Sequence, residues 1–120
     1  MHLVISEHAV PGRYLAIDTD RDTWLLPLRR RSIHIGRGLS ADLRIDDSRV
    51  SRLHAIVMQQ AGEVHLLDSR SLNGTYVNGH RVMAARLRHG DTMRVGPLNL
   101  RYVEVPFQLI RQAPPAGAAA

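Results

Sequence analysis

Three short polar motifs follow one another along the chain, and each contains residue types that bind anions or peptide groups. They are Gly36-Arg37, Ser51-Arg52-Leu53-His54 and Asn73-Gly74-Thr75-Tyr76-Val77-Asn78-Gly79. The first follows a strand-like segment at 32–35, the second precedes one at 55–59, and the third comes shortly after one at 64–68. Binding groups often lie in loops at strand ends, because the strands form a rigid scaffold. We therefore expect the three motifs to act together at one end of a β-structure.

The side chains of these motifs suit a phosphate group carried on a peptide. Arg37, Ser51 and Arg52 offer two guanidinium groups and a hydroxyl. A hydrogen bond between a donor and a charged group contributes roughly 1.5–3 kcal/mol. Asn73 offers a paired donor and acceptor, which a peptide main chain requires. The residues alone leave two interpretations open, a phosphopeptide clamp and ordinary loop arginines.

The elements that must position these motifs are short strands. Nine strand-like segments are recognisable, and several alternate apolar and polar residues as half-buried antiparallel strands do. They are residues 14–17, 24–28, 32–35, 43–45, 55–59, 64–68, 75–77, 92–95 and 98–105. In the last segment, Leu98, Leu100 and Tyr102 are expected to face one way, with Asn99 and Arg101 facing the other.

Turn residues separate these segments. Asn73-Gly74 and Asn78-Gly79 suit tight hairpins, because Asn and Gly accept positive φ. Further turns are expected between the remaining segments, at Gly62, Gly90-Asp91 and Gly96-Pro97. No window carries a 3.6-residue apolar period. Many short strands with regular turns predict an all-β sandwich or barrel.

Length and composition limit the other possibilities. The 120 residues suffice for one domain, and the absence of cysteine excludes a disulfide framework and thiolate metal sites. The apolar run at 3–5 is too short for a signal peptide, and no stretch approaches a membrane span of about 20 apolar residues. These features predict a cytoplasmic protein.

All 16 cationic residues are arginines, and the formal net charge is +5. A GC-rich genome would favour arginine codons, whereas a phosphate-binding surface would favour the bidentate geometry of the guanidinium group. Composition alone does not separate these explanations. Arg44, Arg49 and Arg70 are interpreted first as surface residues.

The ordered set of three motifs resembles the signature of the forkhead-associated (FHA) domain family. The resemblance covers residues 13–105 and implies an antiparallel β-sandwich of about eleven short strands. We accordingly expect an FHA domain at 13–107, an N-terminal segment at 1–12 that is either an edge strand or flexible, and a flexible tail at 108–120.

The resemblance implies a role for each motif residue. Arg37, Ser51 and Arg52 would contact the phosphate, and Asn73 would hold the peptide main chain. Further candidates for peptide contact are Arg49, Leu72 and Thr75. Residues that would support the site structurally are Gly36, His54, Gly74 and Asn78. We also hypothesise that Arg49 favours an acidic residue C-terminal to the phosphothreonine, because a nearby cation would attract it.

The function implied is a phosphothreonine-peptide reader, acting as an adaptor in Ser/Thr-kinase signalling. The expected partner is a Thr-phosphorylated segment of a kinase or of its substrate, with no cofactor, nucleic acid or membrane involved. An alternative keeps the fold but binds partners, or a second copy, through a surface that does not depend on phosphate.

Three other classes of function are disfavoured. Ser51 and His54 lack the context of a G-x-S-x-G elbow, and the chain has neither a P-loop nor any lysine, so catalysis is not expected. The seven histidines form no ligand-spaced cluster, so no metal site is expected. A nucleic-acid interface usually interleaves basic and aromatic residues, and only five aromatic residues occur here.

Overall fold

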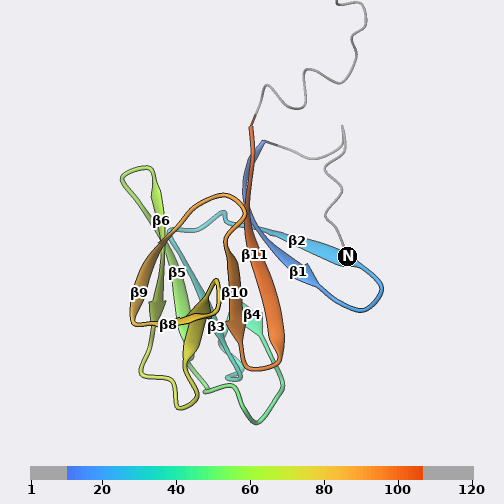
Figure 1. Ribbon diagram of the computed structural model, residues 1–120, viewed down its shortest axis with the longest axis vertical. Helices are drawn as coiled ribbons and strands as arrows, with labels where there is room; N and C mark the ends of the chain where they lie inside the picture. The colour runs from blue at the N-terminus through green and yellow to red at the C-terminus, as the bar shows by residue number, and fades with distance from the viewer. Residues whose placement is uncertain (1–10, 107–120) are drawn as a thin grey trace, which may run out of the picture.

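The protein is a sandwich of two β-sheets, described by a computed structural model for residues 11–106 (Figure 1). The strands are β1 (Gly12–Asp18), β2 (Thr23–Pro27), β3 (Ser32–Gly36), β4 (Leu43–Arg44), β5 (Ala55–Gln60), β6 (Glu63–Asp68), β7 (Thr75–Val77), β8 (His80–Val82), β9 (Ala84–Leu87), β10 (Thr92–Val95) and β11 (Leu98–Val105). The described residues include no helix that is long and apolar enough to cross a membrane. All eleven regular elements of the described residues are strands, so the all-β prediction is confirmed.

The two sheets contain six and five strands. Their orders are β2-β1-β11-β10-β7-β8 and β4-β3-β5-β6-β9. Neighbouring strands pair antiparallel except for β3 and β4, which are parallel. The chain crosses from the five-stranded sheet to the six-stranded sheet between β6 and β7, so this loop joins the two layers.

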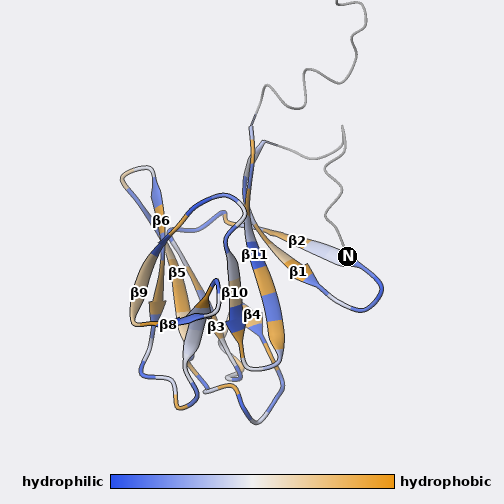
Figure 2. Cartoon of the chain, in the orientation of Figure 1, coloured by the Kyte–Doolittle hydropathy of each residue, from blue (hydrophilic) through white to orange (hydrophobic). Residues whose placement is uncertain are grey.

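One apolar core fills the space between the sheets. Leu15, Ile35, Leu66 and Tyr102 come from both sheets and expose almost none of their surface. Burying one such side chain contributes about 1.5–3 kcal/mol. Figure 2 shows the alternation of hydrophobic and hydrophilic residues along β11 that places one side of the strand in this core. The expected facing of residues 98–102 is confirmed by this burial pattern.

The structure differs from the sequence prediction in several boundaries. Strands β8 and β9 were not among the predicted segments, because their residues are largely exposed and show no apolar alternation. They are strands because they pair with β7 and β6. Strand β1 begins at Gly12, one residue before the expected domain start, and Gly12 pairs with Val105. The expectations for 1–10 and for the tail at 108–120 lie outside the described residues.

Three connections gather at one end of the sandwich, the lower end in Figure 1. They are the β3–β4 loop (37–42), the β4–β5 loop (45–54) and the β6–β7 loop (69–74). The predicted motifs at 36–37, 51–54 and 73–79 begin in these loops or border them. The sandwich therefore brings together segments that lie far apart along the chain.

Candidate functional site

A buried histidine connects two of the three loops. His54 is fully buried, and its Nδ1 accepts a hydrogen bond of 3.0 Å from the Ser51 backbone N–H. The ring proton therefore lies on Nε2, which donates to the Gly74 carbonyl oxygen over 2.8 Å. The neutral ring thus fixes the β4–β5 loop against the β6–β7 loop.

The β3–β4 loop lies directly on the β4–β5 loop. The Arg37 and Gly38 backbone N–H groups donate to the carbonyl oxygens of Ser51 and Arg52, over 2.9 and 3.0 Å. A Cβ atom at Gly36 would lie 2.1 Å from the Arg52 carbonyl oxygen, well inside contact distance. Glycine is therefore required at position 36 by the close approach of two backbone segments.

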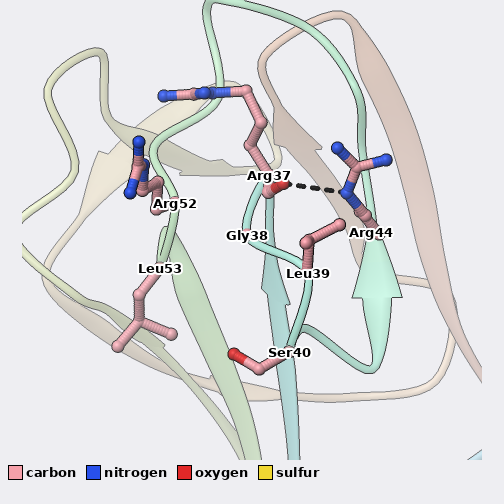
Figure 3. A pocket seen from close by; sticks show the side chains of 7 residues that line it. All are labelled: Arg37, Gly38, Leu39, Ser40, Arg44, Arg52 and Leu53. Carbon is pink, nitrogen blue, oxygen red and sulfur yellow. Dashed lines mark hydrogen bonds between the residues drawn. The ribbon is translucent and has the colours of Figure 1, made fainter.

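Two guanidinium groups reach the surface where these loops meet. Arg37 is held by a 2.9 Å hydrogen bond from its Nε to the Val50 carbonyl oxygen. The two terminal nitrogens of Arg37, and the whole guanidinium group of Arg52, have no hydrogen-bond or ion-pair partner among the described residues. Both side chains line a pocket of about 600 Å³, where Figure 3 shows their charged ends on the same side. This arrangement leaves several N–H donors available to an anion.

Ser51 supplies a hydroxyl in the β4–β5 loop, where it precedes Arg52 in the chain. Its Oγ accepts a 3.1 Å hydrogen bond from the Leu72 backbone N–H. The hydroxyl proton has no acceptor among the described residues, so it can donate to a ligand oxygen. The Leu72 side chain is 83% exposed at the same end of the sandwich.

Asn73 lies at the tip of the β6–β7 loop. Its Nδ2 donates to the Arg49 carbonyl oxygen over 2.9 Å, which joins this loop to the β4–β5 loop. Its Oδ1 and its second amide hydrogen have no described partner and can meet a peptide main chain. Gly74 follows with a φ of +92°, a left-handed conformation that favours glycine and turns the chain into β7.

A carboxylate beneath the β6–β7 loop organises it, and sequence reasoning did not identify this residue as part of the site. Asp68 accepts hydrogen bonds from the Ser71 N–H and hydroxyl, and from the Thr75 hydroxyl at 2.7 Å. Although partial burial acts to raise the pKa of Asp68, the hydrogen bonds from Ser71 and Thr75 hold it below its usual value. An Asp three residues before a Ser in a loop was the available signal, since Asp side chains commonly accept from backbone N–H groups in turns.

The expectation that Thr75 contacts a peptide is wrong. Its side chain is fully buried beneath the loop and bonded to Asp68. The reason is that Thr75 begins strand β7, where side chains alternate between the two faces, and its own side chain points inward.

Arg49 is engaged within its own loop. Its Nε and one terminal nitrogen donate to the two Asp47 carboxylate oxygens, each over 2.9 Å. The hydrogen bonds from the Arg49 side chain and backbone lower the pKa of Asp47 to about 2. The charge on Arg49 is thus already compensated by a carboxylate that stays ionised above strongly acidic pH.

Asn78 lies away from these groups, in the β7–β8 hairpin. Asn78 and Gly79 have φ values of +49° and +84°, as a tight hairpin of this type requires. The Asn78 side chain accepts from the Thr92 N–H over 3.0 Å and donates to Asp91 over 3.1 Å. It therefore links the hairpin to the turn before β10.

The residues considered for catalysis do not form a nucleophile–base pair in this structure. His54 hydrogen-bonds to the backbone of Ser51 and not to its hydroxyl. Asp68 bonds to Ser71 and Thr75. Within residues 11–106, no three histidines, cysteines or carboxylates gather in a way that could hold a metal ion.

The protein thus combines a β-sandwich with arginine, serine and asparagine side chains in the loops at one end. A family model of the FHA domain matches residues 33–96, more than half of the chain. The chain therefore belongs to the FHA domain family.

Individual relatives agree with this assignment. The glycogen accumulation regulator GarA of Mycolicibacterium smegmatis is 41% identical over 71 residues, which are 59% of this chain and 45% of GarA. The curated relatives considered match over between 8% and 55% of their own length, so the chain corresponds to only part of each.

Solved structures show the same fold. An FHA domain from a study of phosphothreonine-dependent FHA domain interactions superposes with a TM-score of 0.73 at 33% identity, covering 80% of this chain and 99% of that one. The FhaA FHA domain, complexed with the intracellular domain of Rv3910, superposes with a TM-score of 0.70 at 34% identity, covering 76% and 99%.

Proposed function

We propose that this protein binds phosphothreonine-containing segments of partner proteins through the loops at the end of its sandwich. The observation that carries the proposal is the pocket that Arg37 and Arg52 line with unpartnered guanidinium N–H groups, with the free hydroxyl of Ser51 in the same loop as Arg52. The FHA domain studied for phosphothreonine-dependent interactions supports the same function through its 33% identity and shared fold.

Each group has a distinct role in this proposal. Arg37 and Arg52 neutralise the phosphate dianion, and the Ser51 hydroxyl donates to one of its oxygens. Asn73 uses its free amide hydrogen and Oδ1 to hold the peptide backbone beside the phosphothreonine. His54, Gly36 and Asp68 keep the three loops in register, so the donors are positioned before the ligand arrives.

The biological role that follows is a reader of Ser/Thr-kinase signals, which recruits a phosphorylated kinase or substrate and carries out no reaction on it. Binding to a short peptide should be micromolar, because the peptide loses conformational entropy and contacts little area. The affinity should fall with added salt, and also below about pH 6, where the phosphate loses its second charge.

Calorimetric titration of a degenerate phosphothreonine peptide mixture tests the proposal. Phosphoserine and unphosphorylated mixtures serve as ligand controls. The Arg37→Ala variant should lose measurable binding, whereas Arg88→Ala should bind as wild type does, because Arg88 is an exposed arginine remote from the three loops. Equal binding of phosphorylated and unphosphorylated mixtures would refute the proposal and favour a surface that does not depend on phosphate.

A further inference from the structure

The edge strands of the two sheets differ in how well they are protected from pairing with another chain. Within the described residues the edges are β2 and β8 of the six-stranded sheet, and β4 and β9 of the five-stranded sheet. Strands β4, β8 and β9 are two, three and four residues long, and each contains an arginine. Short edges and edge charges discourage pairing with a foreign strand. Strand β2 has five residues and no charge, so it is the edge most open to pairing.

The main chain of Leu25 faces this open edge. Opposite residues in antiparallel strands alternate between pairs that exchange hydrogen bonds and pairs that do not. The Leu28 N–H donates to the Arg13 carbonyl oxygen over 2.8 Å, so these two residues form a hydrogen-bonded pair. Leu25 and Ala16 lie opposite each other three positions further along, and they therefore form a pair of the other class. The N–H and C=O of Leu25 consequently point away from β1.

Trp24 exposes a large apolar surface on the same strand. Its side chain is 63% exposed. The neighbouring residues hold the strand in place, because Leu26 packs against the main core and Leu25 against the smaller apolar cluster of Val103 and Val105. Figure 1 shows the β1–β2 hairpin projecting from the side of the sandwich, whereas the three loops lie at its lower end. The edge is thus a fixed apolar surface, separate from the proposed phosphopeptide site.

The charges at the two ends of β2 make the strand complementary to a second copy of itself. The turn before β2 contains two carboxylates and one arginine, at 20–22, and the segment after it contains three arginines, at 29–31. All six residues are exposed. In an antiparallel pair, the start of each strand lies beside the end of the other. The acidic turn of one copy would therefore lie beside the arginines of the other, and opposite charges at such positions attract.

We propose that two copies of this chain associate through their β2 strands, antiparallel and about a two-fold axis, so that their six-stranded sheets become continuous. Full overlap of the five-residue strand centres the pairing on Leu25, which exchanges two main-chain hydrogen bonds with its counterpart. Pro27 has no N–H to contribute at the end of the strand. Trp24 of one copy lies opposite Leu26 of the other, on the same face of the joined sheet.

This association does not depend on the proposed phosphopeptide function. Where both hold, the dimer presents two phosphopeptide sites on one particle. It can then bind a doubly phosphorylated partner with increased avidity, or bring two phosphorylated partners together.

Sedimentation velocity of the full chain between about 1 µM and 1 mM tests the association, because small interfaces are usually weak. The average mass of wild type should rise from that of one chain toward that of two. Trp24→Lys should weaken the dimer at least about tenfold, since a lysine on an edge strand opposes pairing. Met83→Lys is the matched control, because it replaces an exposed apolar side chain outside β2 with the same charge, and it should dimerise as wild type does.

Fluorescence of the wild type reports on this edge without any substitution. Trp24 is the only tryptophan of the chain. Its emission should shift to shorter wavelength over the concentration range in which the mass rises, because the ring leaves water for the apolar surface of the other copy. A dimer that forms with no change in this emission would place the interface elsewhere and overturn the inference.

A charge exchange tests the antiparallel arrangement. In the centred register, residue 20 of one copy lies close to residue 30 of the other. Asp20→Arg and Arg30→Asp should each weaken the dimer severalfold, and the variant that carries both should recover most of the wild-type affinity. Arg30 lies 3.1 Å from Asp42 in its own chain, but the loss of that ion pair cannot produce a recovery in the double variant. Weakening that simply adds up in the double variant would refute this arrangement.

The remaining outcomes also decide the matter. Wild type that stays monomeric up to about 1 mM, or a dimer that persists unchanged in Trp24→Lys, overturns the inference. If wild type is monomeric and a variant lacking residues 2–10 dimerises, the edge is covered by the N-terminal segment of the same chain instead. Trp24→Lys should bind phosphothreonine peptides as wild type does, so failure of this inference is distinguishable from failure of the proposed function.

Discussion

At the scale of single residues, the site depends on which hydrogen-bonding groups are already occupied. The Ser51 hydroxyl accepts a hydrogen bond from the Leu72 N–H, but its own proton is donated to no described residue. Asn73 donates one amide hydrogen to the Arg49 carbonyl oxygen, and its second amide hydrogen and its Oδ1 have no partner among the described residues. Arg44 and Arg49 also differ in this respect. Arg49 forms an ion pair with Asp47 at 2.9 Å, whereas Arg44 lies 3.7 Å from Asp46. Residue type alone does not show these differences.

Ser51→Ala should weaken phosphothreonine-peptide binding by about tenfold or more, because one hydrogen bond to a charged oxygen is lost. The free energy of unfolding should fall by only about 1 kcal/mol, since the Leu72 N–H can turn to water at this exposed end. Calorimetry and urea unfolding measure the two effects. A variant that binds as tightly as wild type would show that Ser51 is not a ligand donor.

Asp68 should make the protein sensitive to acid. Its pKa is lower in the folded state than its usual value, so the carboxylate stabilises the fold above about pH 4, and this contribution is lost as the pH falls through the lowered pKa. Asp68→Asn should lower the free energy of unfolding at pH 7 by about 1–3 kcal/mol and flatten its acid dependence. Urea unfolding between pH 3 and 7 compares the two proteins, and parallel pH curves would contradict the assignment.

At the scale of elements, the turns divide into those that build the site and those that only close a hairpin. Gly36 permits the end of β3 to touch the β4–β5 loop, and an added Cβ would meet the Arg52 carbonyl oxygen. Gly79 closes the β7–β8 hairpin with a φ of +84°, and an added Cβ there would meet nothing within 4 Å. The two glycines are thus required for different reasons.

Gly36→Ala should therefore reduce both stability and peptide affinity. The added Cβ would displace the backbone at Arg52, and Arg52 is one of the proposed phosphate-binding residues. Gly79→Ala should cost about 1–2 kcal/mol of stability through its positive φ while leaving affinity unchanged. Thermal unfolding and peptide titration of both variants test the distinction. Equal loss of affinity in the two variants would show that the hairpin also supports the site.

At the scale of the whole molecule, a buried phenol in the core between the sheets makes the fold sensitive to alkali. Tyr102 is fully buried on β11 and donates to Glu104 Oε2 over 2.6 Å. Burial first, and then the hydrogen bond to Glu104 and its negative charge, raise the pKa of Tyr102 above its usual value of about 10.

The folded protein should consequently lose stability above about pH 10. There the unfolded chain releases the Tyr102 proton while the folded state retains it, so rising pH favours unfolding by up to about 1.4 kcal/mol per pH unit. Tyr102→Phe should be less sensitive to alkali than wild type, as measured by urea unfolding from pH 8 to 11. The chain contains no lysine that would titrate in this range. An identical loss in both proteins would assign the effect to another group.

Much of the fold was readable from local pattern. Strands Thr75–Val77, Thr92–Val95 and Leu98–Val105 have the bounds that the sequence predicts, because alternation and turn residues are local properties. Strands β8 and β9 were missed, since they exist through pairing with strands whose own patterns are stronger.

For the site as well, the sequence determined some features and the tertiary structure determined others. The residue types and order of the motifs marked Arg37, Ser51 and Asn73 as ligand candidates, because phosphate and peptide chemistry demand those functional groups. Only the tertiary structure decided that Thr75 is buried and that Arg44 faces the pocket. The direction and pairing of a loop side chain depend on contacts between segments distant in sequence, and no local pattern encodes those contacts.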